Sequence, residues 1–295
     1  MKVSFDELKR IRTDNPAAIK SVLAARDRRK YNGEKLLIIA ADHPARGALS
    51  VAGDRFAMAS RKDLLDRFAE ALSNPQVDGV LGTPDLIEDL ALMGLLESKI
   101  VVGSMNRGGL SGSSFEFDDR FTAYSINAIK QQRLDFAKTL LRINLEDSAT
   151  VQTLESTARA VDAAVEHEIP IMIEPFMSSW VDGRAVNQLT TAAVIKSVAI
   201  AAGLGVSSAR TWLKLPVVPE MHRVMEATTL PTLLLGGDAE PDQDVMFASW
   251  EDALELPGVN GLVVGRSLLY PPDGNVSGAV AIAAEMVHQA KLGGQ

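Results

Sequence analysis

Short apolar runs rich in β-branched residues alternate with longer amphipathic stretches from Leu36 to the end of the chain. This alternation is typical of β-strands followed by α-helices, in which the strands pair in parallel through right-handed crossovers. The pattern predicts eight strands, at residues 36–41, 78–81, 99–103, 135–142, 169–174, 211–216, 231–235 and 260–264. Helical periodicity between the strands predicts helices at residues 61–72, 85–96, 152–166, 190–203, 242–254 and 276–291.

Eight strand–helix units without a linker between them favour an α/β protein with a closed (β/α)₈ (TIM) barrel. The main alternative is an open doubly wound sheet, which usually carries a glycine-rich phosphate turn after its first strand. Here the first strand is followed by Asp42-His43-Pro44, and glycines come after the seventh and eighth strands. We therefore predict a single barrel domain over residues 1–295, in which residues 1–35 form N-terminal helices that cover the bottom of the barrel.

The composition excludes several functional classes. With 46% hydrophobic and 23% charged residues, the chain resembles an ordinary globular protein. A net charge of −8 disfavours a nucleic-acid partner, because phosphate backbones require a clustered basic face. The absence of cysteine excludes disulfides, thiolate metal sites and a cysteine nucleophile. No secretory signal pattern and no long apolar run is present, so we expect a cytoplasmic protein without a membrane partner.

Charged residues near strand ends interrupt the apolar pattern. In a barrel, side chains alternate between the lumen and the helix layer, and active sites form at the C-terminal ends of the strands. This alternation turns Glu174 of the fifth strand and Lys214 of the sixth strand inward. Lys138 and Arg142 share the inward face of the fourth strand, and Asp42 has inward parity at the end of the first.

These inward-facing charges have two interpretations. A buried charge is costly unless it is paired or used, so one interpretation is a purely structural network in which Asp42 and Glu174 neutralise Lys138 and Lys214. Their position on four strands at the catalytic end favours chemistry instead. A nucleophilic lysine must be neutral, and a second ammonium nearby lowers its pKa by repulsion. The pattern therefore predicts Lys214 as the nucleophile, Lys138 as the group that tunes it, and Glu174 as a general acid and base.

Glycines after the last two strands indicate a phosphate site. Gly236-Gly237 follows the seventh strand, and Gly265-Arg266 follows the eighth. Loops at these two positions of a barrel commonly bind phosphate through backbone amides, and Arg266 adds a forked cation. We predict that these four residues bind the phosphate of a small substrate, and that the inward-facing Arg142 also contacts the substrate.

Residues 105–114 form an unusually long Gly/Ser segment after the third strand. A segment of this kind in a compact enzyme is either a lid or binding loop, or an exposed and disordered excursion. Both interpretations remain open from the sequence.

Histidine is too scarce to favour a metal-dependent mechanism. His167 and His288 fall on predicted helices, which leaves His43 and His222 near the catalytic end. A metal-dependent aldolase generally holds its divalent ion with several imidazole ligands, so we predict no metal. His43 is expected to contact or orient the substrate, whereas His222 belongs to a loop or a helix start.

Taken in order, these segments resemble the class I aldolase superfamily of the DhnA/LacD type. That group includes archaeal-type fructose-bisphosphate aldolase, tagatose-bisphosphate aldolase and relatives of deoxyribose-phosphate aldolase. The chain is also similar to a family of actinobacterial barrel proteins encoded with inositol-catabolism genes. The segments that carry the resemblance are 41–44, 137–141, 173–175, 213–216, 236–237 and 265–266.

The resemblance implies an imine on Lys214 and cleavage of a phosphorylated ketose or keto-acid, without a cofactor. For the inositol-linked family the implied substrate is 6-phospho-5-dehydro-2-deoxygluconate, and the superfamily implies a homo-oligomer. The segment after the third strand and residues 142–144, where relatives often carry aromatics, depart from the pattern and leave the substrate open. Two other hypotheses remain, a non-catalytic sugar-phosphate sensor and a metal-dependent lyase or isomerase.

Overall fold

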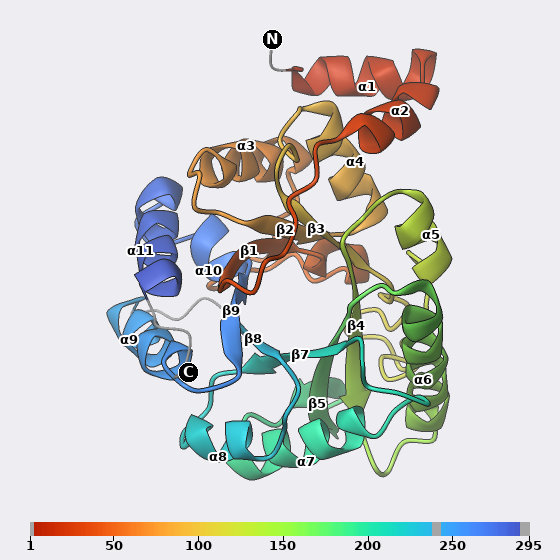
Figure 1. Cartoon of the computed structure of the whole chain (residues 1–295), viewed down its shortest axis with the longest axis vertical. Helices are drawn as coiled ribbons and strands as arrows, with labels where there is room; N and C mark the ends of the chain where they lie inside the picture. Colours follow the sequence, from red (N-terminus) through yellow and green to blue (C-terminus); the bar gives the residue numbers. More distant parts are fainter. Residues whose placement is uncertain (1–2, 238–242, 290–295) are drawn as a thin grey trace.

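Eight parallel strands close into a barrel, as the hydrophobic pattern predicts (Figure 1). The computed structural model describes residues 3–237 and 243–289. Pairing of β1 with β9 and of β4 with β5 completes the ring, so the open doubly wound sheet is excluded. The barrel strands are β1 (Leu36–Ala41), β2 (Gly79–Gly82), β3 (Ile100–Ser104), β4 (Phe136–Ile143), β5 (Ile171–Val181), β7 (Thr211–Pro216), β8 (Thr232–Leu235) and β9 (Val259–Val264).

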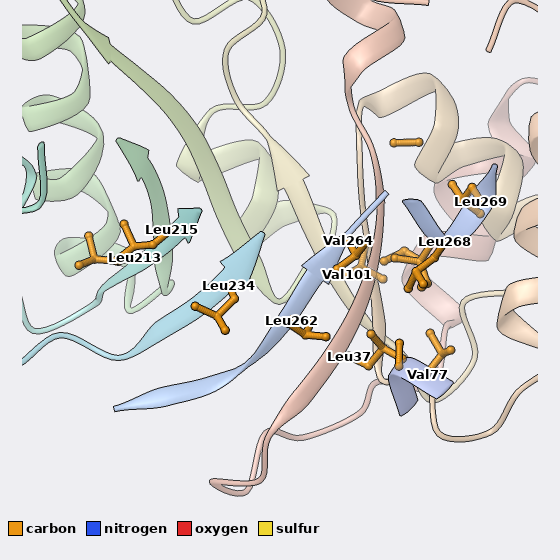
Figure 2. Packing of buried hydrophobic residues seen from close by; sticks show 14 of the residues in the cluster. Leu37, Val77, Val101, Leu213, Leu215, Leu234, Leu262, Val264, Leu268 and Leu269 are labelled. Atoms are coloured by element: carbon orange, nitrogen blue, oxygen red, sulfur yellow. The ribbon is translucent and has the colours of Figure 1, made fainter. Parts of the chain in front are cut away.

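Side chains alternate along the strands between two apolar layers. The residues that fill the lumen are Leu36, Ile38, Ala40, Leu81, Ile100, Val102, Phe136, Met172, Leu233 and Val263. The residues between them pack outward against the helices, including Leu37, Leu213, Leu215, Leu234, Leu262 and Val264 (Figure 2). Burial on both faces explains why each strand is an almost continuous apolar run in the sequence. The predicted parity of the first, fifth and sixth barrel strands is confirmed.

Six long helices cover the outside of the barrel within a few residues of their predicted positions. They are α3 (Arg61–Leu72), α4 (Pro84–Leu92), α6 (Ala149–His167), α7 (Thr191–Ala202), α9 (Gln243–Leu254) and α11 (Val276–Gln289). Residues 242, 290 and 291 of the predicted helices lie outside the described residues. Short elements escape the prediction because one or two turns show no measurable period; these are η1 (His43–Arg46), α5 (Ile126–Gln131), α8 (Met221–Glu226) and α10 (Arg266–Leu269). Within the described ranges, every helix is too short or too polar to cross a membrane.

The fifth strand continues beyond the barrel, which the sequence analysis does not predict. β5 runs for 11 residues and turns back into the antiparallel strand β6 (Arg184–Asn187). Asp182 and Gly183 adopt left-handed φ values of 49° and 73°, as a tight hairpin turn requires. The signal for this hairpin is the Asp-Gly pair between two extended runs.

The two N-terminal helices lie on the flank of the barrel beside α4 (Figure 1). They are α1 (Phe5–Asp14) and α2 (Ala17–Ala25), and they confirm the predicted helical extension. Arg12 fastens α1 to α4, since its Nη2 lies 2.8 Å from Asp89 Oδ1. Both N-terminal helices therefore pack against α4 on the outside of the barrel.

The segment that follows α2 reaches the bottom of the barrel. Arg26 is buried and donates to Lys99 O at 2.7 Å and to Asp135 Oδ2 at 3.0 Å, beside the first residues of β3 and β4. Tyr31 meets the lumen residue Trp212 edge to face, with ring centroids 5.4 Å apart. This segment, rather than α1 or α2, closes the bottom of the lumen.

An ion pair at this end of the barrel predicts a pH-dependent stability. His288 Nε2 lies 2.8 Å from Gln76 O and 3.3 Å from Oδ2 of the buried Asp78. The hydrogen bond with Asp78 outweighs burial and raises the pKa of His288. The stabilisation is therefore fully present below the unfolded-state pKa of about 6.5, and it is lost as pH rises through the folded-state pKa.

We expect His288→Gln to lower the unfolding free energy by about 1 kcal/mol or less near pH 6, and by a smaller amount at alkaline pH. Urea denaturation of the parent and the variant over this pH range measures the difference. An equal loss at acidic and alkaline pH would contradict the role of the charged imidazole.

Candidate active site

Four of the five charged residues predicted to face the lumen meet at the C-terminal end of the barrel. Lys138, Glu174 and Lys214 lie on β4, β5 and β7, and Asp42 directly follows β1. All four are buried. Each side chain follows the inward parity of its strand, and the ion pairs between them place all four in one layer of the lumen.

Their polar atoms form one continuous series of ion pairs, which we call the lysine–carboxylate chain (Asp42, Lys138, Glu174 and Lys214). Lys138 Nζ lies 3.0 Å from Asp42 Oδ2 and also contacts Glu174 Oε2. Lys214 Nζ lies 2.7 Å from Glu174 Oε1. Glu174 therefore bridges two ammonium groups, one on each carboxylate oxygen.

The pKa values of Lys138, Lys214 and Glu174 are all lowered in the lysine–carboxylate chain, but for different reasons. Burial lowers the pKa of Lys138 well below its ordinary value. The positive charges of Arg107 and Lys214 lower it further, whereas the carboxylate of Glu174 raises it. Burial also lowers the pKa of Lys214, against the attraction of Glu174. Burial opposes the charge of Glu174, but Lys138, Lys214 and Arg107 outweigh it and hold the pKa of Glu174 well below its ordinary value. Glu174 stays ionised, and the lysines lose a proton more easily than exposed lysines do.

Arg107 also reaches the chain, from the loop after β3, and strand parity does not predict it. Its guanidinium contacts Asp42 and is buried. Ser104, the last residue of β3, donates to the same carboxylate at 3.2 Å. Loop residues have no fixed parity, but a basic residue just after the C-terminal end of a barrel strand is a signal for this position.

The first half of the long Gly/Ser segment is folded against the barrel. Asn106 Oδ1 accepts from Leu140 N at 2.7 Å, and its Nδ2 donates to Leu140 O at 2.6 Å. A Cβ at Gly109 would lie 2.2 Å from Glu116 O, so only glycine fits there. The interpretation as an exposed and disordered excursion is wrong for residues 105–109, and residues 110–114 form a largely exposed tip. A lid function stays a prediction.

Arg142 is held by this loop instead of joining the lysine–carboxylate chain. Its Nη1 donates to Glu116 Oε1 at 2.7 Å, and Arg46 contacts the same oxygen. Burial and the nearby Arg46 lower the pKa of Arg142 to about 10. The Arg142 guanidinium thus already has protein partners in the loop. Its predicted contact with substrate stays a prediction.

The glycines predicted to bind phosphate have packing roles of their own. A Cβ at Gly265 would lie 2.3 Å from Ala40 O, and one at Gly236 would lie 2.6 Å from Val264 Cγ1. Gly237 is exposed and has a φ of 68°. These constraints explain the glycines without a ligand, so phosphate binding remains a prediction for them.

His43 lies beside the lysine–carboxylate chain, with Nδ1 3.7 Å from Asp42 Oδ1. Burial and the cations Arg266 and Lys214 lower the pKa of His43 well below its ordinary value, although 25% of the side chain remains accessible to solvent. His43 is therefore neutral at physiological pH. Arg266 begins α10 shortly after β9, so it lies at the same end of the barrel as His43.

Two surface hollows are lined by residues outside the lysine–carboxylate chain. One of about 410 Å³ adjoins the C-terminal ends of β4 and β5 and is lined by Asn144, Ser178 and Lys196 among others. The other, of about 560 Å³, lies beside α5 and α6 and is lined partly by Tyr124 and Arg159. The lysine–carboxylate chain itself is enclosed, and Lys214 is only 3% exposed.

The chain is distantly similar to the class I aldolases. An archaeal fructose 1,6-bisphosphate aldolase superposes with a TM-score of 0.64 at 17% identity, over 92% of this chain and 99% of that one. A second archaeal structure, with the catalytic lysine covalently bound to the carbinolamine intermediate, has a TM-score of 0.65 at 18% identity, over 92% and 99%. The 2-amino-4,5-dihydroxy-6-oxo-7-(phosphonooxy)heptanoate synthase of Streptomyces griseus is 23% identical over 217 residues, which cover 72% of this chain and 74% of the synthase.

The chain belongs to the Cgl0159-like family, whose model matches residues 34–284. The crystal structure of Cgl0159 from Corynebacterium glutamicum (Brevibacterium flavum) has a TM-score of 0.95 and 59% identity, over 98% of this chain and 99% of that one. The resemblance inferred from the sequence segments is thus confirmed in part, as a likeness in fold to the archaeal aldolases and a distant similarity to the Streptomyces synthase.

Proposed function

We propose that the protein is a class I aldolase that forms an imine between Lys214 and the carbonyl carbon of a phosphorylated ketose or keto-acid. The observation that supports this most is the carboxylate of Glu174, shared between the buried ammonium groups of Lys138 and Lys214. In a low-dielectric site, two ammonium groups repel each other strongly, which favours the loss of one proton. A neutral amine is the species that attacks a carbonyl.

The reaction uses side chains of this protein together with water. The neutral Nζ of Lys214 attacks the ketone carbon, and the carbonyl oxygen takes up a proton from solvent to give a carbinolamine. Glu174, 2.7 Å from Nζ, accepts the proton of the nitrogen and returns it to the departing hydroxyl, so that water leaves and an iminium forms. The iminium accepts the electron pair of the breaking C–C bond while the aldol hydroxyl gives its proton to Asp42 or Glu174. The enamine is then protonated and hydrolysed, which releases the ketone and Lys214.

Lys138 acts beside the nucleophile in this scheme. It is fully buried between Asp42 and Glu174, whereas Lys214 pairs with Glu174 and keeps a small exposed area. Its positive charge disfavours a proton on Lys214, and its remaining hydrogen-bond capacity suits a substrate hydroxyl.

Two observations support a phosphorylated substrate: the position of Arg266 and the names of the relatives. Arg266 offers a guanidinium at the end of the barrel where the reaction would take place. The archaeal relative acts on fructose 1,6-bisphosphate, and the Streptomyces enzyme makes a compound with phosphate and carboxylate groups. The first substrate to test is 6-phospho-5-dehydro-2-deoxygluconate, whose cleavage in inositol catabolism gives dihydroxyacetone phosphate and malonate semialdehyde.

Borohydride trapping tests the proposal directly. Incubation with dihydroxyacetone phosphate and then borohydride should convert the imine to a secondary amine on the peptide that contains Lys214. The exposed Lys196 of α7 serves as the internal control within the same protein and should stay unmodified. No adduct with several phosphorylated ketoses would favour a sugar-phosphate sensor, and an adduct on Lys138 would exchange the two lysine roles. Chelator-sensitive activity without an adduct would indicate a metal-dependent lyase.

Arg266 is expected to act mainly in binding. We expect Arg266→Ala to raise KM for the phosphorylated substrate about 10- to 100-fold with little change in kcat, because a charged hydrogen bond contributes about 1.5–3 kcal/mol. Steady-state kinetics with phosphorylated and unphosphorylated substrates measure the effect. Equal turnover of both substrates, unaffected by the substitution, would contradict a phosphate site at Arg266.

A further inference from the structure

Three donors converge on a single oxygen of Asp42. Lys138 Nζ lies 3.0 Å from Asp42 Oδ2, Ser104 Oγ lies 3.2 Å from it, and the Arg107 guanidinium contacts it as well. Asp42 is fully buried, so its charge is balanced by these neighbours and not by solvent. Lys138 therefore shares Asp42 with a second cation.

The number of charges decides whether a lysine can be neutral. Asp42 and Glu174 alone would supply one carboxylate for each of Lys138 and Lys214, and both ammonium groups would be stable. Arg107 adds a third cation to this enclosed set. The buried Asp119 also acts on Arg107, but it is shared with Arg142, whose Nη2 lies 3.7 Å from Asp119 Oδ2. A guanidinium does not give up its proton in a protein, so the excess positive charge is relieved by loss of a proton from a lysine.

We propose that Arg107 is a positioning residue that occupies Asp42, so that the two lysines share Glu174 and one of them becomes the neutral amine. The proposal rests on the imine chemistry proposed above, but it concerns how the amine is prepared. In this proposal a loop residue outside the barrel strands controls the protonation state of the nucleophilic lysine.

The charged groups around each lysine shift its pKa in the direction that this proposal requires. After burial, Arg107 is the largest influence that lowers the pKa of Lys138, while Glu174 raises it and Lys214 lowers it. For Lys214, burial, Arg107 and Arg266 lower the pKa, and Glu174 raises it. His43, which also faces the chain, stays neutral and adds no charge. Arg107 is among the main influences that lower the pKa of both lysines.

The loop holds Arg107 in place. The neighbouring Asn106 makes two hydrogen bonds with the backbone of Leu140, so the main chain next to Arg107 is tied to β4. Arginine also suits the task better than lysine, because a buried lysine would itself tend to lose its proton.

Titration of the lysines by reductive methylation tests this inference independently of aldol activity. The parent is treated with formaldehyde and cyanoborohydride across a pH series, and mass spectrometry follows Lys138, Lys214 and the exposed Lys196. Formaldehyde is small and uncharged, and it labels a neutral amine whether or not the protein cleaves a sugar phosphate. A failure to trap dihydroxyacetone phosphate would therefore refute the proposed function without affecting this measurement.

We expect Arg107→Gln to move the methylation midpoint of the more easily titrated site lysine upward by about one to three pH units, the usual effect of a nearby charge. The double variant Arg107→Gln/Asp42→Asn should return the midpoint toward the parent value, because it removes the carboxylate that Arg107 occupied. Arg120→Gln, at an exposed position of the same loop region, is the matched control and should leave the midpoint unchanged.

Two results would overturn the inference. One is an unchanged midpoint in folded Arg107→Gln, and the other is an equal upward shift in the double variant. If Arg107→Gln does not fold, Asp42→Asn alone decides the question, since it retains Arg107 and should lower the midpoint further. A midpoint that stays constant or rises in Asp42→Asn would also refute the proposal.

Discussion

Substitution of Lys214 by alanine should abolish the borohydride-trapped adduct and lower turnover by a factor of about 10³ or more. Removal of a covalent nucleophile leaves only substrate binding and charge stabilisation to accelerate the reaction. Lys214 also has a close partner for proton transfer, since its Nζ lies 2.7 Å from Glu174 Oε1. The measurements are mass spectrometry of the reduced adduct and an assay for aldehyde release.

Two further variants sharpen this prediction. Lys196→Ala on the exposed face of α7 is the matched control and should retain both the adduct and turnover. Lys138→Ala should still give an adduct on Lys214, but more slowly, because the Lys214 pKa rises when the neighbouring ammonium is removed. An adduct of full yield in Lys214→Ala would assign the nucleophile elsewhere.

Glu174→Gln should slow both imine formation and turnover by about 10²- to 10⁴-fold, the usual contribution of a positioned acid–base group. The amide keeps the shape of the side chain but cannot accept the proton of the carbinolamine nitrogen. Single-turnover trapping with borohydride separates imine formation from C–C cleavage. Glu168→Gln, an exposed position at the end of α6, is the matched control. Unchanged trapping kinetics in Glu174→Gln would exclude Glu174 from proton transfer.

The same substitution should change stability in a pH-dependent way. Loss of one partner from a buried ion pair costs about 3–5 kcal/mol when the remaining charges stay in place. The folded-state pKa of Glu174 lies well below its unfolded value of about 4.3. Its stabilisation is thus fully present above the unfolded pKa and is lost as pH falls through the folded pKa. The difference in unfolding free energy between the parent and Glu174→Gln, measured by urea denaturation, should therefore become smaller at acidic pH.

The barrel and the lysine–carboxylate chain could be predicted from the sequence because both follow from strand periodicity. Strands buried on two faces appear as short apolar runs, and the alternation of side chains assigns each residue to the lumen or to the helix layer. An inward-facing charge near a strand end then stands out against apolar neighbours, as Lys138, Glu174 and Lys214 do. Local sequence determines these positions, because the strand geometry alone orients the side chains.

Only the tertiary structure decided which partners those charges have. Arg107 belongs to a loop without periodicity, and its contact with Asp42 joins residues 65 positions apart. Arg142 follows the same inward parity as Lys138, yet the loop supplies Glu116 as its partner, 26 positions away. The physical reason is that an ion pair depends on distances between side chains from separate segments. Periodicity orients a side chain within its own strand, whereas only the folded chain brings a particular opposite charge within contact.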